Sequence, residues 1–199
     1  MKKISAAAIQ ILQQRLSCND ELALKELYDA FAAQLFHFAY AIVHSKEIAE
    51  EIIEDVFIKV WQKRSRIAEV ESLAFYLFIT TKNISCNYLR KYNRNKNIAL
   101  EELSLPYYYI NASPEDLLIT SETLQNINNA INQLPPQCRI IFKLVKEDGL
   151  KYKEVAALLN LNIKTIENQI GIALKKLHAS VELIFPAVKR SDASKTSDH

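Results

Sequence analysis

The sequence predicts an all-α protein built from two small helical domains that are joined by a flexible linker. Turn residues are scarce, because the 199 residues include 2 Gly and 5 Pro, too few for a βαβ or an all-β fold. Hydrophobic residues make up 49% of the chain, which is enough for a folded core. Apolar residues recur every three or four positions, the period of amphipathic helices. The length also suits two small domains.

Residues 1–20 are predicted to be a weakly amphipathic N-terminal extension, and their sequence indicates no function. Asn19 or Asp20 then supplies an N-cap, because a short polar side chain accepts hydrogen bonds from the free amides of a first helical turn. The helix that follows has an apolar seam for packing against another helix: Leu24, Leu27, Phe31, Leu35, Phe38 and Ile42.

Ser45 predicts the start of a second helix, whose two faces differ. Its inward face is Ile48, Ile52, Val56 and Val60, with Phe57 and Trp61 on the flanks. The outward face is acidic and is formed by Glu50, Glu51, Glu54 and Asp55. Such a face is usually only solvated, but it can also attract a basic partner. A carboxylate metal centre would need Glu-x-x-His units on two helices, which the sequence lacks, so no metal or cofactor is predicted.

A basic segment surrounds the third helix, which Ser72 begins and which ends near Tyr92. The preceding loop, residues 62–72, contains Lys63, Arg64 and Arg66. One third of the helix circumference collects amide, aromatic and basic side chains, namely Asn83, Asn87, Tyr88, Arg90, Lys91, Tyr92 and Arg94. Rings stack on bases while cations follow phosphates, so this face suits a nucleic-acid strand, although the helix dipole alone also favours basic helix ends.

The second half begins after a segment without periodicity. Residues 95–124 are predicted to hold the linker and the first turns of a helix that Ser113 caps. Pro135-Pro136 ends that helix and opens another, Gln137–Lys146, which Gly149 terminates. Residues 125–185 form the second domain, and residues 186–199 are a polar tail.

Tyr152–Leu177 has the layout of a helix-turn-helix, the unit that places its second helix in a DNA major groove. Asn162 is predicted to cap the second helix. Its inward stripe is Ile163, Ile166, Ile170, Ala173, Leu174 and Leu177, and its outer face is Lys164, Thr165, Asn168, Gly171, Ile172 and Lys175. Short polar side chains with lysines at both ends suit base edges and phosphates. A surface helix pair with a solvated face would show the same pattern.

Several classes of protein are disfavoured. Cys18, Cys86 and Cys138 are far apart and form no CxxC pair, so a reducing, cytoplasmic environment is expected. No apolar run reaches transmembrane length, so no membrane span is predicted. The sequence contains no nucleophile–base pair, metal spacing or phosphate loop, which argues against an enzyme.

The chain resembles the sigma-70 family, specifically the extracytoplasmic-function (group 4) sigma factors. Ala49–Trp61 is similar to the region 2 pattern of acid pairs, Phe and terminal Trp. Three later segments are similar to the following parts of region 2, regions 2.3 and 2.4: Phe75–Ile79, Lys82-Asn83 and Tyr88–Lys91. Three segments of the second half resemble region 4: Leu134–Arg139, Tyr152–Ala156 and Lys164–Asn168. Their amino-acid sequence is most similar to that of the iron-citrate-regulator-like subgroup.

The resemblance implies three binding surfaces and no cofactor. Region 2 would dock on the β′ clamp helices of core RNA polymerase through Glu50, Glu51, Glu54, Asp55, Phe57 and Trp61. It would open and contact the promoter −10 strand through Lys63, Arg64, Arg66, Lys82, Asn83, Asn87, Tyr88, Arg90 and Lys91. Region 4 would approach the β flap and contact the −35 duplex through Lys164, Thr165, Glu167, Asn168, Ile172 and Lys175. The family also implies a monomer when free and an anti-sigma factor as a partner.

The chain departs from the family pattern at a few positions. Asn87 stands where Asp is usual, Asn160 where Gly is frequent in the turn, and Gln169 where the subgroup often has His. Thr80-Thr81 replaces small apolar residues. Asn tolerates a left-handed turn better than most residues, so the helix-turn-helix is expected to form.

Two other interpretations fit part of the pattern. A helix-turn-helix regulator with a sensory N-terminal half would bind duplex DNA without polymerase. The similarity of the first half to region 2 and the absence of the βα alternation of a receiver domain disfavour it. A helical protein-interaction adaptor would use the same amphipathic helices and would be indifferent to loss of Arg90 and Lys91.

Overall fold

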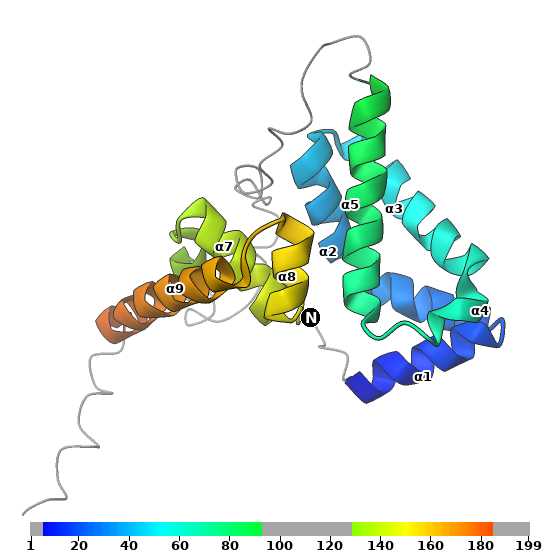
Figure 1. The fold of residues 1–199 in the computed structure, drawn as a ribbon, viewed down its shortest axis with the longest axis horizontal. Coiled ribbons are helices and arrows are strands. Elements are labelled where there is room, and N and C mark those ends of the chain that lie inside the picture. The colour runs from blue at the N-terminus through cyan, green and yellow to red at the C-terminus, as the bar shows by residue number, and fades with distance from the viewer. Residues whose placement is uncertain (1–5, 93–128, 185–199) are drawn as a thin grey trace, which may run out of the picture.

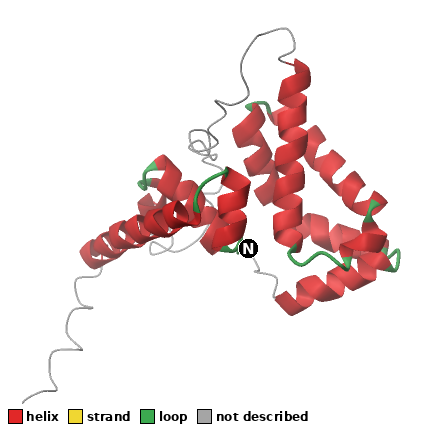
Figure 2. Ribbon diagram, viewed as in Figure 1, coloured by secondary structure: helices red, strands yellow, loops and turns green. Residues whose placement is uncertain are grey.

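A computed structural model describes residues 6–92 and 129–184, and over these residues the secondary structure is helical, with no strand (Figures 1 and 2). The first group of helices is α1 (Ala6–Ser17), α2 (Glu21–Val43), α3 (Lys46–Gln62), α4 (Arg64–Ile67) and α5 (Leu73–Tyr92). The second group is α7 (Pro136–Phe142), the π-helix η6 (Lys143–Glu147), α8 (Tyr152–Leu159) and α9 (Ile163–Ile184). The all-α, two-domain fold is therefore confirmed.

Local capping explains where the helices of the first group begin. The Asp20 carboxylate accepts hydrogen bonds from the amides of Leu22 and Ala23, at 2.9 and 3.3 Å. The Ser45 hydroxyl accepts from the amide of Ile48 at 3.3 Å, and the Ser72 hydroxyl accepts from the amide of Phe75 at the same distance. All three predicted caps are confirmed, because capping depends only on residues within one turn.

Helices α2, α3 and α5 pack against one another around one apolar core (Figure 1). The predicted seam of α2 is buried from Leu27 to Ile42, while Leu24 is half-buried. At the centre, the rings of Phe38 and Phe78 meet edge to face with centroids 5.2 Å apart. Helix α1 closes one end of this group, where it packs against α2 and α4.

The second group is held by α9, which packs against α7 and α8. Asn160 adopts a left-handed conformation in the turn, with φ of 55°, as expected for the residue in place of Gly. Asn162 caps α9, since its side-chain oxygen accepts from the amide of Lys164 at 2.8 Å. The buried thiol of Cys138 on α7 donates to the side-chain oxygen of Gln169 on α9 at 2.6 Å. Gln169 therefore joins the two helices.

Three details differ from the sequence prediction. The loop at residues 62–72 contains the short helix α4, whose Ile67 is buried. The helix predicted at Gln137–Lys146 is α7 followed by a wider π-turn, η6. Ile163 and Leu174 were predicted to face inward but are 46% and 48% exposed. The buried stripe of α9 is narrower because α7 and α8 together cover only the side bearing Ile166, Ile170 and Ala173.

Several expectations lie outside the described residues. They concern the flexible linker, the helix expected after Ser113 and the polar tail at residues 186–199. Within the two described segments, no helix combines the length and the apolar character needed to cross a bilayer.

The two groups of helices touch where α8 lies beside α5 (Figure 1). The ammonium of Lys82 on α5 donates to the backbone carbonyl of Leu158 on α8 at 2.8 Å. At the start of α5, the Glu71 carboxylate faces the ammonium groups of Lys151 and Lys153, at 3.4 and 3.8 Å. The groups therefore form a closed arrangement.

Candidate functional surfaces

The first surface is the acidic face of α3. Glu50, Glu51, Glu54 and Asp55 are all exposed, as predicted from helical periodicity. Phe57 is instead buried at 6% exposure, and its ring lies 4.9 Å from that of Tyr28 on α2. Trp61 is half-buried. The exposed carboxylates form a surface that can bind a basic partner, while Phe57 belongs to the core beneath it.

The second surface is the polar face of α5. Asn83, Asn87, Arg90 and Lys91 are exposed, and Tyr88 is half-buried among them. The Arg90 guanidinium donates to the side-chain oxygen of Asn87 at 2.8 Å, which fixes the two groups side by side. The face thus combines cations, amides and an aromatic ring on consecutive turns of α5. Contact with an unpaired nucleic-acid strand uses this combination.

The unusual Thr81 of α5 lies on the other side of the helix and is fully buried. Its hydroxyl donates to the carbonyl of Leu77 at 2.9 Å, and the buried Ser85 hydroxyl donates to the carbonyl of Thr81 at 2.8 Å. Each buried hydroxyl is satisfied within the helix, so this departure from the family pattern does not alter the outer face.

A third feature is an open pocket of about 440 Å³ beside α4, here called the α4 pocket. It is lined by Gln62, Lys63, Ser65, Arg66, Ile67, Val70 and Tyr76. Lys63 and Arg66 are exposed at this pocket. Arg64 does not line it, because its guanidinium lies 4.4 Å above the Trp61 ring and donates to Asn19 at 2.5 Å. Arg64 thus links α4 to the turn after α1.

Lys82 is the predicted strand contact that the structure places elsewhere. It is half-buried, and its ammonium is held by the Leu158 carbonyl near the end of α8. The last carbonyls of a helix have no partner within it and carry the negative end of the helix dipole, so a lysine is favourable there. In this closed arrangement Lys82 is not available to a phosphate.

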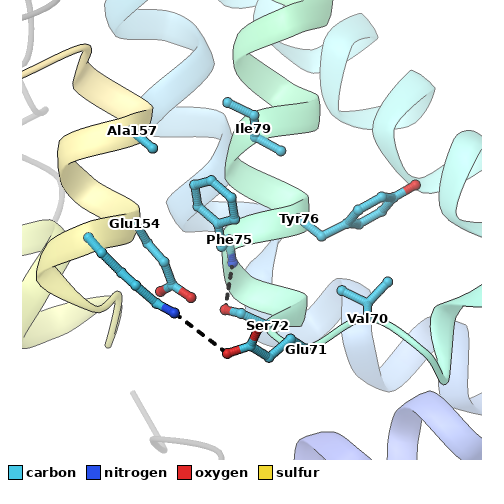
Figure 3. Close-up of a pocket in the computed structure, with 9 residues that line it drawn as sticks. Val70, Glu71, Ser72, Phe75, Tyr76, Ile79, Glu154 and Ala157 are labelled. Carbon is cyan, nitrogen blue, oxygen red and sulfur yellow. Dashed lines mark hydrogen bonds and ion pairs between the residues drawn. The ribbon is translucent and has the colours of Figure 1, made fainter.

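An open pocket of about 380 Å³ lies where α5 and α8 meet (Figure 3). Phe75 and Ile79 from α5 face Ala157 from α8. Glu71 and Lys153 also line the pocket, and the Lys153 ammonium lies 3.8 Å from the Glu71 carboxylate. The lining thus combines apolar side chains with the exposed charges of Glu71 and Lys153 and with the buried Glu154, whose carboxylate accepts from the backbone amide of Lys151.

The fourth surface is the outer face of α9. Lys164, Glu167, Asn168 and Lys175 are exposed, Thr165 is half-buried, and Ile172 is 41% exposed. The Lys164 ammonium lies 3.2 Å from the Glu167 carboxylate, one turn along. A Cβ added to Gly171 would meet nothing within 4 Å, so the centre of the face is flat and open. All six predicted residues therefore share one face that a DNA groove can approach.

Among the described residues, the one whose pKa changes most is Asp148, which lies outside these surfaces. Burial, and next the Glu147 carboxylate, raise the pKa of Asp148 to about 7. Burial also raises the pKa of the Cys138 thiol, which stays protonated as the donor to Gln169. Among the described residues no group of three or more His, Cys, Asp or Glu side chains is placed to hold a metal ion.

Two helical groups, one with an acidic face beside a strand-binding face and the other with a helix-turn-helix, define a DNA-binding protein with a second, basic partner. Two family models match separate segments of the chain. The model described as Sigma-70 region 2 matches residues 27–95, and the model described as Sigma-70, region 4 matches residues 124–177. The two matches together span more than half of the chain, which belongs to the sigma-70 family.

Similarity to individual relatives identifies the branch of the sigma-70 family to which the chain belongs. The chain is 23% identical over 196 residues to the ECF RNA polymerase sigma-E factor of Escherichia coli K12, covering 91% of this chain and 96% of that protein. It is 25% identical over 148 residues to the ECF sigma factor SigE of Mycolicibacterium smegmatis, covering 73% and 56%. The chain is an extracytoplasmic-function sigma factor, and it directs transcription initiation at promoters.

The fold is also similar to that of a solved sigma factor, RpoE in a co-crystal with the anti-sigma factor NepR from Bartonella quintana. The TM-score is 0.48, with 22% identity over 80% of this chain and 96% of that one.

Proposed function

We propose that this sigma factor divides its work among the surfaces described above. The acidic face of α3 docks on the β′ clamp helices of core RNA polymerase, the α4 pocket and α5 contact the −10 strand, and α9 contacts the −35 duplex. The observation that carries the proposal is that most residues of each predicted set fall on an exposed face of their own. The exceptions are Phe57, which is buried, and Arg64 and Lys82, which are engaged within the fold. The chain acts in the cytoplasm and is a monomer when free.

The polymerase contact is supported by charge. Four exposed carboxylates lie within two turns of α3: Glu50, Glu51, Glu54 and Asp55. We leave Phe57 out of the direct contact because Tyr28 covers it, so its ring supports the face from beneath. Trp61, half-buried at the end of α3, lies at the edge of this surface.

The −10 contact is supported by the chemistry of the α4 pocket. A base that has left the duplex stack needs a slot with polar groups for its edge and an aromatic neighbour for its face. Lys63, Ser65 and Arg66 supply polar groups, and Tyr76 supplies the ring. A preformed slot lowers the cost of unstacking, which is a few kcal/mol.

The −35 contact is supported by the flat centre of α9. Asn168 can make paired hydrogen bonds to an adenine edge, and Ile172 can contact a thymine methyl group. The absence of a side chain at Gly171 permits close approach of the helix backbone. Lys164 and Lys175 flank these groups, where phosphates would lie.

Two finer assignments rest on resemblance. The resemblance of Leu134–Arg139, Tyr152–Ala156 and Lys164–Asn168 to region 4 supports the proposal that the chain is related to the iron-citrate-regulator-like subgroup. An anti-sigma factor, expected from the family, would be the partner that controls access to core polymerase.

Run-off transcription with core RNA polymerase on a promoter library tests the proposal. We expect transcription that depends on the chain and on both promoter elements. Binding of the chain to duplex promoter DNA without polymerase, together with indifference to core polymerase, would instead indicate a conventional helix-turn-helix regulator.

A further inference from the structure

The α4 pocket rests on a segment outside the family match. The region 2 model begins at residue 27, yet α1 packs along α4 and α2 (Figure 1). Leu12 and Leu16 of α1 are buried at 4% and 0% exposure, which anchors the helix. The N-terminal extension is thus part of the folded first domain and lies against the short helix that forms the pocket.

Gln13 is the polar exception on this buried side of α1, at 5% exposure. Its side-chain amide donates to the carbonyl of Ile67 at 2.8 Å and to the carbonyl of Val70 at 2.9 Å. Burying a primary amide is costly unless it is hydrogen-bonded. Both donors of Gln13 are used, and both acceptors are main-chain groups of one turn.

That turn is the wall of the α4 pocket. Ile67 is the last residue of α4, and its carbonyl also accepts from the amide of Val70 at 3.2 Å. Ile67 and Val70 both line the pocket, whereas Gln13 does not. Carbonyls at the end of so short a helix have few partners in the helix itself, so the turn is fixed from outside.

We propose that Gln13 is a positioning residue for promoter base recognition, which holds the Ile67–Val70 turn so that the α4 pocket is formed before a base enters. The proposal rests on the proposed function of that pocket. Preorganisation matters because binding energy is not then used to order the turn. A slot of fixed shape also distinguishes one base from another, whereas a loose turn accommodates several.

The test compares Gln13→Met with Gln14→Met in holoenzyme assembled on core RNA polymerase. Met has a similar length but no donor, and the neighbouring Gln14 is exposed on the same helix. Each holoenzyme transcribes a promoter library randomised in the −10 and −35 elements. For Gln13→Met we expect base preference at one or two −10 positions to fall about tenfold, because a turn that is no longer held from outside accommodates several bases. The −35 preferences and the affinity for core polymerase stay at the levels of Gln14→Met.

A folded Gln13→Met chain with the unaltered −10 profile overturns the proposal, as does an equal loss at both elements. Melting curves set the temperature of the assay below the lower transition. If Gln13→Met does not fold, Gln13→Asn takes its place, since it keeps the amide but withdraws it from the carbonyls. Failure of the proposed function gives a different result, because the unaltered chain itself then shows no −10 preference.

Discussion

The Lys82 ammonium on α5 donates a 2.8 Å hydrogen bond to the Leu158 carbonyl on α8, so the two DNA-contacting domains are closed on each other. The −10 and −35 elements are numbered about 25 positions apart on the promoter, which corresponds to about 85 Å of duplex at about 3.4 Å per base pair. Helices in direct contact cannot occupy both elements at once. We therefore propose that α8 leaves α5 when the promoter is bound, and that this opening exposes Lys82.

The first prediction concerns this closure. Ala157→Arg places a long side chain in the pocket between α8 and α5 without removing any proposed DNA contact. The polar contacts of the interface are the Lys82 hydrogen bond and the exposed ion pairs of Glu71, which together contribute about 2 kcal/mol. We expect the open fraction to rise by roughly tenfold or more, seen as a larger radius of gyration in small-angle scattering. Ala179→Arg, on exposed α9 surface, is the control and should change nothing.

The second prediction concerns polymerase binding. Glu51→Lys reverses a charge at the centre of the acidic face of α3, where the side chain is exposed. We expect affinity for core polymerase to fall about tenfold or more, because like charges across an interface repel. Fluorescence anisotropy measures the affinity, and Glu21→Lys, an exposed reversal at the start of α2, is the control. Equal affinity of the two variants would place the docking surface elsewhere.

The third prediction concerns the −35 element. Asn168→Ala should change base preference by about 1–3 kcal/mol at one or two base pairs, the value of a paired base contact. Transcription from a library of −35 variants measures the preference. A loss that is uniform across all sequences would make Asn168 a phosphate contact, as expected for Lys175→Ala.

The fourth prediction concerns pH. The pKa of Asp148 is raised to about 7 in the folded state, from an ordinary value of 3.8. Between about pH 4 and pH 7 the folded chain keeps a proton that the unfolded chain has released, so the free energy of unfolding falls as pH rises through this window. Asp148→Asn should flatten this dependence and raise stability above pH 7 by about 1 kcal/mol or more.

Urea denaturation at about pH 5 and about pH 8 checks this expectation. Asp29→Asn, at an exposed position of α2, is the matched control and should retain the dependence. A parent chain whose stability is the same at both pH values would show that the pKa of Asp148 is not raised in the folded state.

Much of the fold could be predicted because its signals are local. Asp20, Ser45, Ser72 and Asn162 each cap the helix that the sequence assigns to them, since a cap bonds only to the next turn. The same locality made the outer faces of α3, α5 and α9 predictable from periodicity. The seam of α2 followed for the same reason.

The sequence by itself determined the longer helices, most of their buried sides and the family, but not α4, the π-turn η6 or the exposure of Ile163 and Leu174. Only the tertiary structure decided which neighbours meet across the chain: Phe57 with Tyr28, Arg64 with Trp61 and Lys82 with Leu158. It also decided that Gln13 holds the wall of the α4 pocket, 54 and 57 residues away in the chain. Helical periodicity gives the direction of a side chain around its own axis, but not the element that lies opposite, because that depends on how the helices pack.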